Sequence, residues 1–229
     1  MSAARETYVQ ALALGLDPTW RRRSAAERHD DGCGFAEAMR AAEGDGVRGY
    51  TYSSIGLEPG VDILIWRMAP TIDALEAAAA ATLRGGLGAW LTARASLIGR
   101  VGPSQYVKRP TEQEQSLFAG ERSRYLVVYP FIKSTDWYLL SKEARQGIMN
   151  EHMRVGHSYP MVRQALAYSF GIDSQDFVVA YETDDLAAFG DLVRELRGTE
   201  SRRSTISDSP ILLGIHRSIE EILGLLGAA

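Results

Sequence analysis

Four side chains of different chemistry fall within one stretch of the chain. Tyr129 and Lys133 supply a phenol and an ammonium group. His152 supplies an imidazole, and Gln164 supplies an uncharged amide. An iron porphyrin with propionate groups needs such a set: an imidazole as axial ligand, a cation to pair with a propionate, and polar groups on the opposite side of the iron.

The elements predicted around these residues are strands on either side of one helix. Residues 125–132 form a β-branched and aromatic run, which is typical of a strand. Pro130 within this run predicts a bulge or an unpaired edge near the strand end. Residues 162–170 and 177–182 are predicted to form a hairpin, because a Gly-Ile-Asp turn separates two further strand-like runs.

The predicted helix begins after Ser141, a plausible N-cap, and continues to about Val155. His152 lies on its apolar face, because it falls at helical spacing with Ile148, Met149 and Val155. A core imidazole bonded to a backbone carbonyl would also suit this position. Periodicity by itself favours that simpler interpretation, and the neighbouring phenol, cation and amide favour a metal ligand.

The sequence around these residues resembles the chlorite dismutase-like haem proteins, a family that includes the coproheme decarboxylases of bacterial haem synthesis. The resemblance rests on YPFIKSTDWY (129–138), NEHMRVGHSYP (150–160) and YSFGIDSQDFVVAYETDD (168–185). Lys133 and His152 are nineteen residues apart, which is similar to the family's spacing between its propionate-pairing lysine and its proximal histidine. More loosely, the similarity extends over almost the whole chain.

The resemblance implies a role for each residue of the set. His152 would be the proximal iron ligand, Lys133 would pair with a propionate, and Tyr129 matches a redox-active tyrosine. His157, in the polar turn after the helix, is the second candidate ligand.

Position 164 separates two activities of the family. Chlorite dismutases have an arginine at the matching position, whereas coproheme decarboxylases have a glutamine. Gln164 offers no fixed positive charge to hold an oxychlorine anion, and Arg163 should point to the opposite face of its strand. The chain also departs from actinobacterial-type members, whose distal histidine has no match in the segment 103–123.

Further site residues are implied by the resemblance. Glu200 loosely matches a carboxylate that accepts the N–H of the proximal imidazole. Arg203 lies in a segment similar to one that binds a propionate; the neighbouring Arg202 could fill the same role, and a solvated basic loop is the competing interpretation. Trp137 is a candidate pocket wall, although core packing would explain it as well.

The resemblance implies a peroxide-dependent oxidative decarboxylation of two propionates of iron-coproporphyrin (coproheme), which gives haem b. Hydrogen peroxide would be the second substrate, and the protein would be a homopentamer. The alternatives are a chlorite dismutase, a haem-dependent peroxidase, or a haem-binding protein without catalytic activity.

Composition agrees with a globular protein and disfavours a nucleic-acid partner. The 229 residues carry a formal net charge of -4, and no basic stripe is evident. Cys33 is the only cysteine, which excludes an intrachain disulfide and a CxxCH haem attachment. With no signal-peptide pattern and no membrane-spanning stretch in the sequence, we expect a cytoplasmic protein.

The two halves of the chain follow the same pattern. Ser24 corresponds to Ser141 and Gly85 to Gly198, so the offset drifts only from 117 to 113 residues. We therefore expect an α+β fold of duplicated, ferredoxin-like βαββαβ halves. In the family that the chain resembles, such halves form a chlorite dismutase-like fold, a dimeric α+β barrel.

The predicted boundaries are 1–102 for the first half, 103–123 for a connector, and 124–229 for the second half. The first half has no histidine at the place of His152, so we expect the second half to carry the haem. The first long helix is expected to be interrupted near Gly32–Gly34. The connector would either gate the pocket or serve as a mobile linker.

Overall fold

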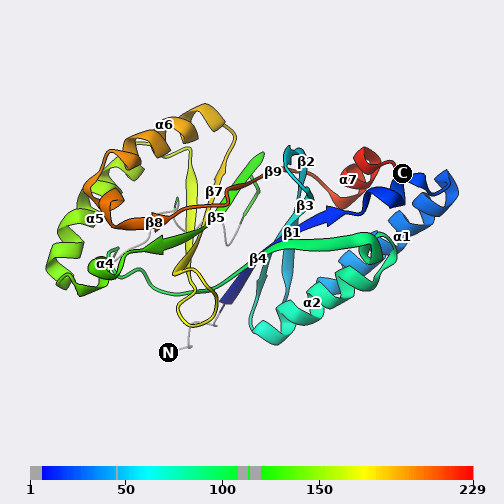
Figure 1. The fold of residues 1–229 in the computed structure, drawn as a ribbon, viewed down its shortest axis with the longest axis horizontal. Coiled ribbons are helices and arrows are strands. Elements are labelled where there is room, and N and C mark those ends of the chain that lie inside the picture. The colour runs from blue at the N-terminus through cyan, green and yellow to red at the C-terminus, as the bar shows by residue number, and fades with distance from the viewer. Residues whose placement is uncertain (1–6, 45, 108–112, 114–119, 229) are drawn as a thin grey trace. The chain divides into compact units, whose positions relative to one another are not determined.

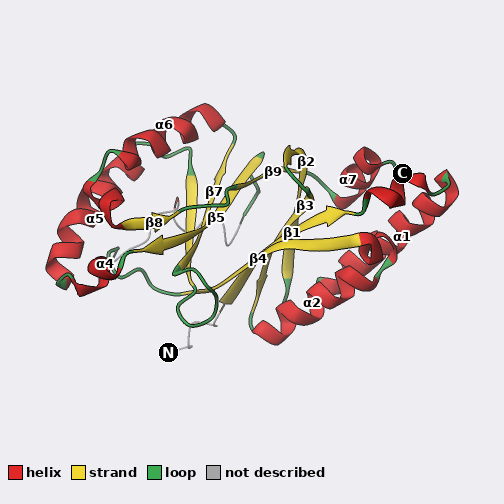
Figure 2. Cartoon of the chain, in the orientation of Figure 1, coloured by secondary structure: helices red, strands yellow, loops and turns green. Residues whose placement is uncertain are grey.

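The computed structural model describes residues 7–44, 46–107, 113 and 120–228. The chain divides into two compact units (Figures 1 and 2). Unit 1 consists of residues 1–101 and 212–229, and unit 2 consists of residues 102–211. Each unit contains its own antiparallel strands and its own helices.

Unit 1 is a sheet with helices packed against it. Its strands pair in the order β4-β1-β3-β2, and β9 lies beside β2. Its elements in chain order are β1 (Thr7–Leu16), η1 (Pro18–Arg22), α1 (Ala25–Ala42), β2 (Arg48–Glu58), β3 (Val61–Ala69), α2 (Ile72–Arg84), η2 (Gly86–Trp90), β4 (Leu91–Val101), β9 (Leu212–His216) and α7 (Ile219–Leu226).

The first long helix is continuous, so the interruption expected near Gly32–Gly34 is wrong. Ser24 caps α1 through a capping box with Glu27, which fixes the start of the helix. Gly32 is buried inside the helix, where a Cβ atom would lie 2.8 Å from the carbonyl oxygen of Ala228. The glycine at this position therefore permits close packing and does not end the helix.

The last residues of the chain belong to unit 1, whereas the sequence pattern assigned all of 124–229 to the second half. β9 pairs with β2, where Tyr52 lies opposite His216. Ile222 and Leu223 of α7 are buried in the same core as Phe35 of α1. Burial of this amphipathic helix explains why the C-terminal segment joins unit 1.

Unit 2 repeats the same order of elements with different contents. Its strands pair antiparallel in the order β8-β5-β7-β6. Its elements are β5 (Tyr125–Lys133), α4 (Thr135–Leu139), α5 (Lys142–His157), β6 (Arg163–Tyr168), β7 (Phe177–Thr183), α6 (Leu186–Arg197), η4 (Glu200–Ser204) and β8 (Thr205–Ser207). In both units a strand, a short helix, a long helix and a hairpin come first, followed by a helix, a 3-10 turn and a final strand.

Strand β5 is paired with β7 through Pro130, which lies opposite Val178. The irregularity falls later, between Ile132 and Lys133, where the register with β8 shifts. Pro130 therefore does not interrupt the pairing that holds Tyr129, and the bulge that its position suggested lies beyond it.

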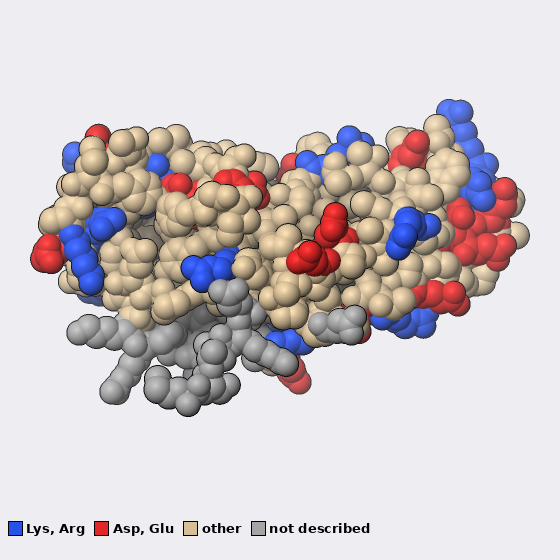
Figure 3. All heavy atoms as spheres, turned by 90° about the horizontal axis from the view of Figure 1, so that it is seen from below, with Lys and Arg blue, Asp and Glu red and all other residues tan. Residues whose placement is uncertain are grey.

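About half of the connector lies outside the described residues, since 108–112 and 114–119 are not among them. The gating role predicted for it stays a prediction. Among the residues that the structure describes, no helix is long and apolar enough to cross a membrane. On the face drawn in Figure 3, Lys and Arg side chains are interspersed with Asp and Glu.

Candidate functional site

All of the site residues predicted from the sequence lie in unit 2. They come from β5, α4, α5, β6 and η4. These elements bring them together in two groups, one around His152 and Lys133 and one around Tyr129.

His152 projects from the second half of α5 toward the 3-10 turn η4. Its Nδ1 atom lies 3.1 Å from Oγ of Ser201, a residue that is itself buried. Among the described residues, no hydrogen-bond partner is found for Nε2. Nε2 is therefore the imidazole atom that can bind a metal, while Nδ1 orients the ring.

The imidazole of His152 is neutral at physiological pH. Burial lowers its pKa to about 4, and the nearby ammonium of Lys133 adds to the effect, while Glu151 opposes it. A neutral imidazole with one nitrogen held by a hydrogen bond is the form in which histidine binds metals.

Lys133, at the end of β5, is 8% exposed. Its Nζ atom donates a hydrogen bond of 2.8 Å to the carbonyl of Ser201, the residue whose hydroxyl contacts His152. The ammonium also lies 4.5 Å from the centre of the Trp137 ring. Burial lowers the pKa of Lys133 to about 8, with Arg202 contributing. Trp137 is buried, and its ring packs against this ammonium group.

Tyr129 belongs to the second group, on the sheet. The centre of its ring lies 6.1 Å from that of Tyr181 on β7. Burial raises the pKa of Tyr129 well above its ordinary value, and Tyr181 raises it further. Gln164 on β6 is paired directly with Tyr181. Tyr181 thus lies between the two predicted residues.

Arg163 follows the face expected for it. It donates a 2.8 Å hydrogen bond to the buried carboxylate of Glu182, the residue with which it is paired on β7. Since Gln164 is the next residue on the strand, its side chain points to the other face.

The 3-10 turn η4 arranges its charged residues outward. Glu200 forms an ion pair of 3.1 Å with Arg203, whose side chain is 81% exposed. Arg202 instead pairs with Asp208 at 2.7 Å and lies near enough to Lys133 to affect its pKa. The hydrogen-bond partner of His152 in this structure is therefore Ser201, the residue after Glu200.

Helix α5 has no buried residue, although one of its faces is apolar. The corresponding helix of unit 1, α1, buries Phe35 and Met39 among others. Ile148, Met149 and Val155 of α5 are only partly covered by the rest of unit 2. An apolar helix face that its own unit leaves partly uncovered is suited to a flat apolar ligand.

A metal bound here would need ligands beyond those of the protein. In the part of the chain that the structure describes, no group of three or more His, Cys, Asp and Glu side chains could hold an ion. One histidine fits a metal that arrives already coordinated by another molecule.

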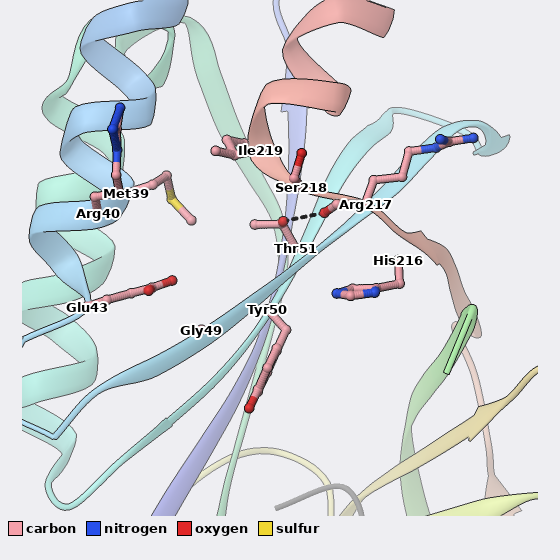
Figure 4. A pocket seen from close by; sticks show the side chains of 10 residues that line it. All are labelled: Met39, Arg40, Glu43, Gly49, Tyr50, Thr51, His216, Arg217, Ser218 and Ile219. Atoms are coloured by element: carbon pink, nitrogen blue, oxygen red, sulfur yellow. Dashed lines mark hydrogen bonds between the residues drawn. The ribbon is translucent and has the colours of Figure 1, made fainter. Parts of the chain in front are cut away.

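A separate pocket of about 250 Å³ lies in unit 1 (Figure 4). Glu43 and His216 face it from opposite sides, and Thr51 bonds the carbonyl of Arg217 at its edge. None of the predicted site residues lines this pocket. Its chemistry is unrelated to the grouping around His152, so the geometry of unit 2 defines the candidate site.

The model of the family described as chlorite dismutase matches residues 28–217. This chain belongs to the chlorite dismutase family. It is 32% identical to a coproheme decarboxylase of Mycolicibacterium smegmatis over 224 residues, which cover 96% of this chain and 94% of the relative. It is also 27% identical to a chlorite dismutase of Ideonella dechloratans over 139 residues, 57% of this chain and 49% of that protein.

Solved structures of the family agree with this fold. A variant of chlorite dismutase from Candidatus Nitrospira defluvii superposes with a TM-score of 0.88 at 26% identity. The match covers 98% of this chain and 97% of that one. The architecture is therefore that of the α+β proteins of the chlorite dismutase family, a family that includes enzymes.

Two residues of this family member were not found from the sequence. Ser201 is adjacent to the predicted Glu200, and a shift of one residue in the turn would have identified it. Tyr181 lies in a strand of ordinary aromatic composition, where nothing but its pairing with Gln164 distinguishes it. Strand register supplies that information, and the spacing of residues along one strand does not.

Proposed function

We propose that this protein binds ferric coproheme and converts two of its propionates to vinyl groups, giving haem b and CO2, while one hydrogen peroxide per propionate takes up the two hydrogens lost and leaves as water. The M. smegmatis relative is a coproheme decarboxylase by name, and the chemistry of the unit 2 residues suits coproheme. The observation that carries the proposal is His152: a neutral imidazole with Nδ1 held by Ser201, on a helix face that unit 2 leaves partly uncovered.

The fit to coproheme extends to its carboxylates. Lys133 supplies a buried ammonium, and Arg202 and Arg203 add two cations from η4. Lys133 would pair with one propionate, and the second cation would be Arg202, which lowers the pKa of Lys133, or the exposed Arg203. A carboxylate beside Lys133 would offset the cost of burying an ammonium.

The iron porphyrin supplies the redox chemistry when it is bound. The residues of this chain bind it, orient it and limit the charge around it. Tyr129 provides a phenol that can exchange a hydrogen atom with a propionate side chain, and burial keeps that phenol protonated at neutral pH. His152 would hold the iron, and the ring of Trp137 packs against the ammonium of Lys133.

Gln164 favours decarboxylation over chlorite decomposition. Its amide can donate a hydrogen bond to water or peroxide, and it has no charge to attract an oxychlorine anion. Arg163, the nearest cation along the strand, is committed to Glu182 on the other face. A chlorite dismutase would require another source of positive charge on the distal side of the iron. A haem peroxidase would require peroxide to be used in a reaction other than decarboxylation.

We further infer that the two units arose by duplication of one ferredoxin-like βαββαβ unit, of which the second carries the haem site. The matching order of elements and of paired strands supports this inference. A homopentamer is proposed with it on the family resemblance, and a cytoplasmic location is proposed as well.

Titration with coproheme, followed by a comparison of oxidants, tests the proposal. Ferric coproheme should give a Soret spectrum that differs from that of free coproheme and saturates at one equivalent, and His152→Ala should lose this native spectrum until imidazole is added. His157→Ala is the matched control and should keep the band. Rapid, sustained oxygen evolution from chlorite by the loaded protein would overturn the preference for decarboxylation.

A further inference from the structure

We infer that Thr199 and Ser201 are positioning residues that fix which nitrogen of the His152 imidazole carries the proton. Their two hydroxyl groups form a chain that keeps the proton on Nδ1 and leaves the lone pair of Nε2 free for iron. The use of Nε2 by iron rests on the proposed function. The chain itself adds Thr199, a residue that acts on the imidazole through Ser201.

The chain begins at the C-terminal end of α6. The hydroxyl of Thr199 lies 2.7 Å from the carbonyl oxygen of Leu196, in the last turn of that helix. A carbonyl oxygen can only accept a hydrogen bond, so the hydroxyl of Thr199 is the donor. Because a hydroxyl group has a single hydrogen, Thr199 must be the acceptor in any further hydrogen bond of this oxygen.

The directions of the next two hydrogen bonds follow from the first. Oγ1 of Thr199 lies 3.1 Å from Oγ of Ser201, and Ser201 is the donor because the hydrogen of Thr199 is already used. Oγ of Ser201 in turn lies 3.1 Å from Nδ1 of His152. With its own hydrogen given to Thr199, Ser201 can only accept here, so Nδ1 carries the hydrogen. A neutral imidazole has one N–H group, and Nε2 therefore keeps its lone pair.

The two hydroxyl groups of this chain are buried. Ser201 is 4% exposed and Thr199 is 6% exposed. Buried hydroxyl groups take their partners from the protein, which favours the contacts within the chain over contacts with bulk water. Lys133 holds Ser201 as well, because its ammonium donates a hydrogen bond of 2.8 Å to the backbone carbonyl of Ser201. Ser201 is thus fixed through both its backbone and its side chain.

The carboxylate expected to accept the N–H of His152 has other partners. Glu200 pairs with Arg203 at 3.1 Å, and its side chain is 54% exposed. Its backbone N–H donates to the carboxylate of Glu151 at 3.0 Å. The acceptor of the imidazole N–H is therefore a hydroxyl group, which is a weaker acceptor than a carboxylate. Nε2 should accordingly be a less basic ligand than a carboxylate partner would make it.

The position of the proton can be measured in the protein without coproheme, where it does not depend on the proposed reaction. Long-range ¹H–¹⁵N correlation spectra at neutral pH distinguish the protonated ring nitrogen of a histidine from the unprotonated one, and His152→Ala assigns the signals. Ser201→Ala and Thr199→Val each remove one hydroxyl group of the chain. Ser204→Ala is the matched control, because Ser204 lies in the same turn and contacts the N–H of Ser134 through its backbone carbonyl.

We expect the wild type and Ser204→Ala to carry the proton of His152 on Nδ1. Ser201→Ala removes the acceptor of this proton, and Thr199→Val frees the hydroxyl of Ser201 to donate to Nδ1. In both variants the ratio of the Nδ1–H form to the Nε2–H form should fall about fivefold, the effect of one hydrogen bond. A fall in Thr199→Val supports the chain in particular, since that variant leaves the partner of the imidazole in place.

A wild-type imidazole protonated on Nε2 would overturn the inference, whether or not the variants fold. An unchanged ratio in either folded variant would also overturn it. So would a shift in Glu200→Gln with none in Ser201→Ala, which would make the carboxylate the acceptor. A Soret titration with ferric coproheme decides the proposed function separately. Absence of a protein-specific spectrum, with the proton found on Nδ1, would refute the proposed function and leave the hydroxyl chain intact.

Discussion

His152 combines a metal-binding nitrogen with a pKa that depends on its surroundings. The pKa of this imidazole falls from 6.5 to about 4 in the folded protein. Between these values the unfolded chain binds more protons than the folded one, so the folded state loses stability as pH falls through this window. The full contribution of the neutral imidazole is present above pH 6.5, and at most about 3 kcal/mol is at stake.

The first prediction compares the wild type with His152→Ala, both without coproheme. The free energy of unfolding of the wild type should fall more steeply between pH 6.5 and 4, because only the wild type has an imidazole to protonate. Denaturant unfolding at several pH values measures this difference. Parallel pH profiles for the two proteins would show that His152 is not buried as described.

The second prediction concerns Lys133, whose pKa falls from 10.5 to about 8 on folding. Burial of its charged form costs stability below pH 8, and the cost disappears as pH rises toward 10.5. Lys133→Met should therefore keep or increase the stability of the coproheme-free protein at pH 7, by up to about 3 kcal/mol. It should also weaken coproheme binding roughly tenfold or more through the lost charge.

Thermal unfolding and a Soret titration of Lys133→Met measure the two effects. Unchanged or higher stability with weaker coproheme binding would identify Lys133 as a binding residue. A fall in both stability and binding would identify it as a structural residue. A variant that unfolds more readily at pH 7 and binds coproheme normally would contradict both parts.

Helix α5 differs from its counterpart α1 in how completely its apolar face is covered. α1 buries five residues, including Phe35 at the position that corresponds to His152 by the offset of 117, whereas α5 buries none. Amide groups of a helix with few buried contacts exchange with solvent through local opening of low free energy.

The third prediction is that the backbone amides of α5 exchange hydrogen faster than those of α1 without coproheme. Addition of coproheme should slow exchange in α5 by at least about tenfold, whereas α1 should change less. Hydrogen–deuterium exchange with peptide-level mass spectrometry resolves the two helices. Equal exchange rates in α1 and α5 without coproheme, together with no change in α5 when coproheme is added, would place the ligand elsewhere.

The elements that carry the site could largely be predicted from sequence, because their patterns are local. The strand at 125–132, the Ser141 cap and the hairpin after residue 162 all correspond to observed elements. The predicted break at Gly32–Gly34 was wrong, since packing against Ala228 makes glycine useful inside α1. Ser201 and Tyr181 were missed because turn geometry and strand register bring them to the site, and neither is visible in spacing along the chain.

The chain as a whole is organised by its two units. The repeat of elements is readable from sequence at an offset of 117 to 113 residues, because caps and turns recur at matching places. The assignment of Leu212–Ala229 to unit 1 could not be read from the sequence. It depends on which strand pairs with β9 and which core buries α7. Such long-range pairing is decided by competition between surfaces, which a local pattern does not record.

The central claim is that unit 2 converts coproheme to haem b, with Tyr129 taking part. The most direct measurement is the mass of the porphyrin recovered after the coproheme-loaded protein, prepared without oxygen, receives peroxide. For the wild type we predict the loss of CO2 and two hydrogen atoms from each of two propionates, while Tyr129→Phe binds coproheme and leaves its mass unchanged. Recovery of unaltered coproheme from the wild type, or haem b from Tyr129→Phe at the wild-type rate, would contradict the account.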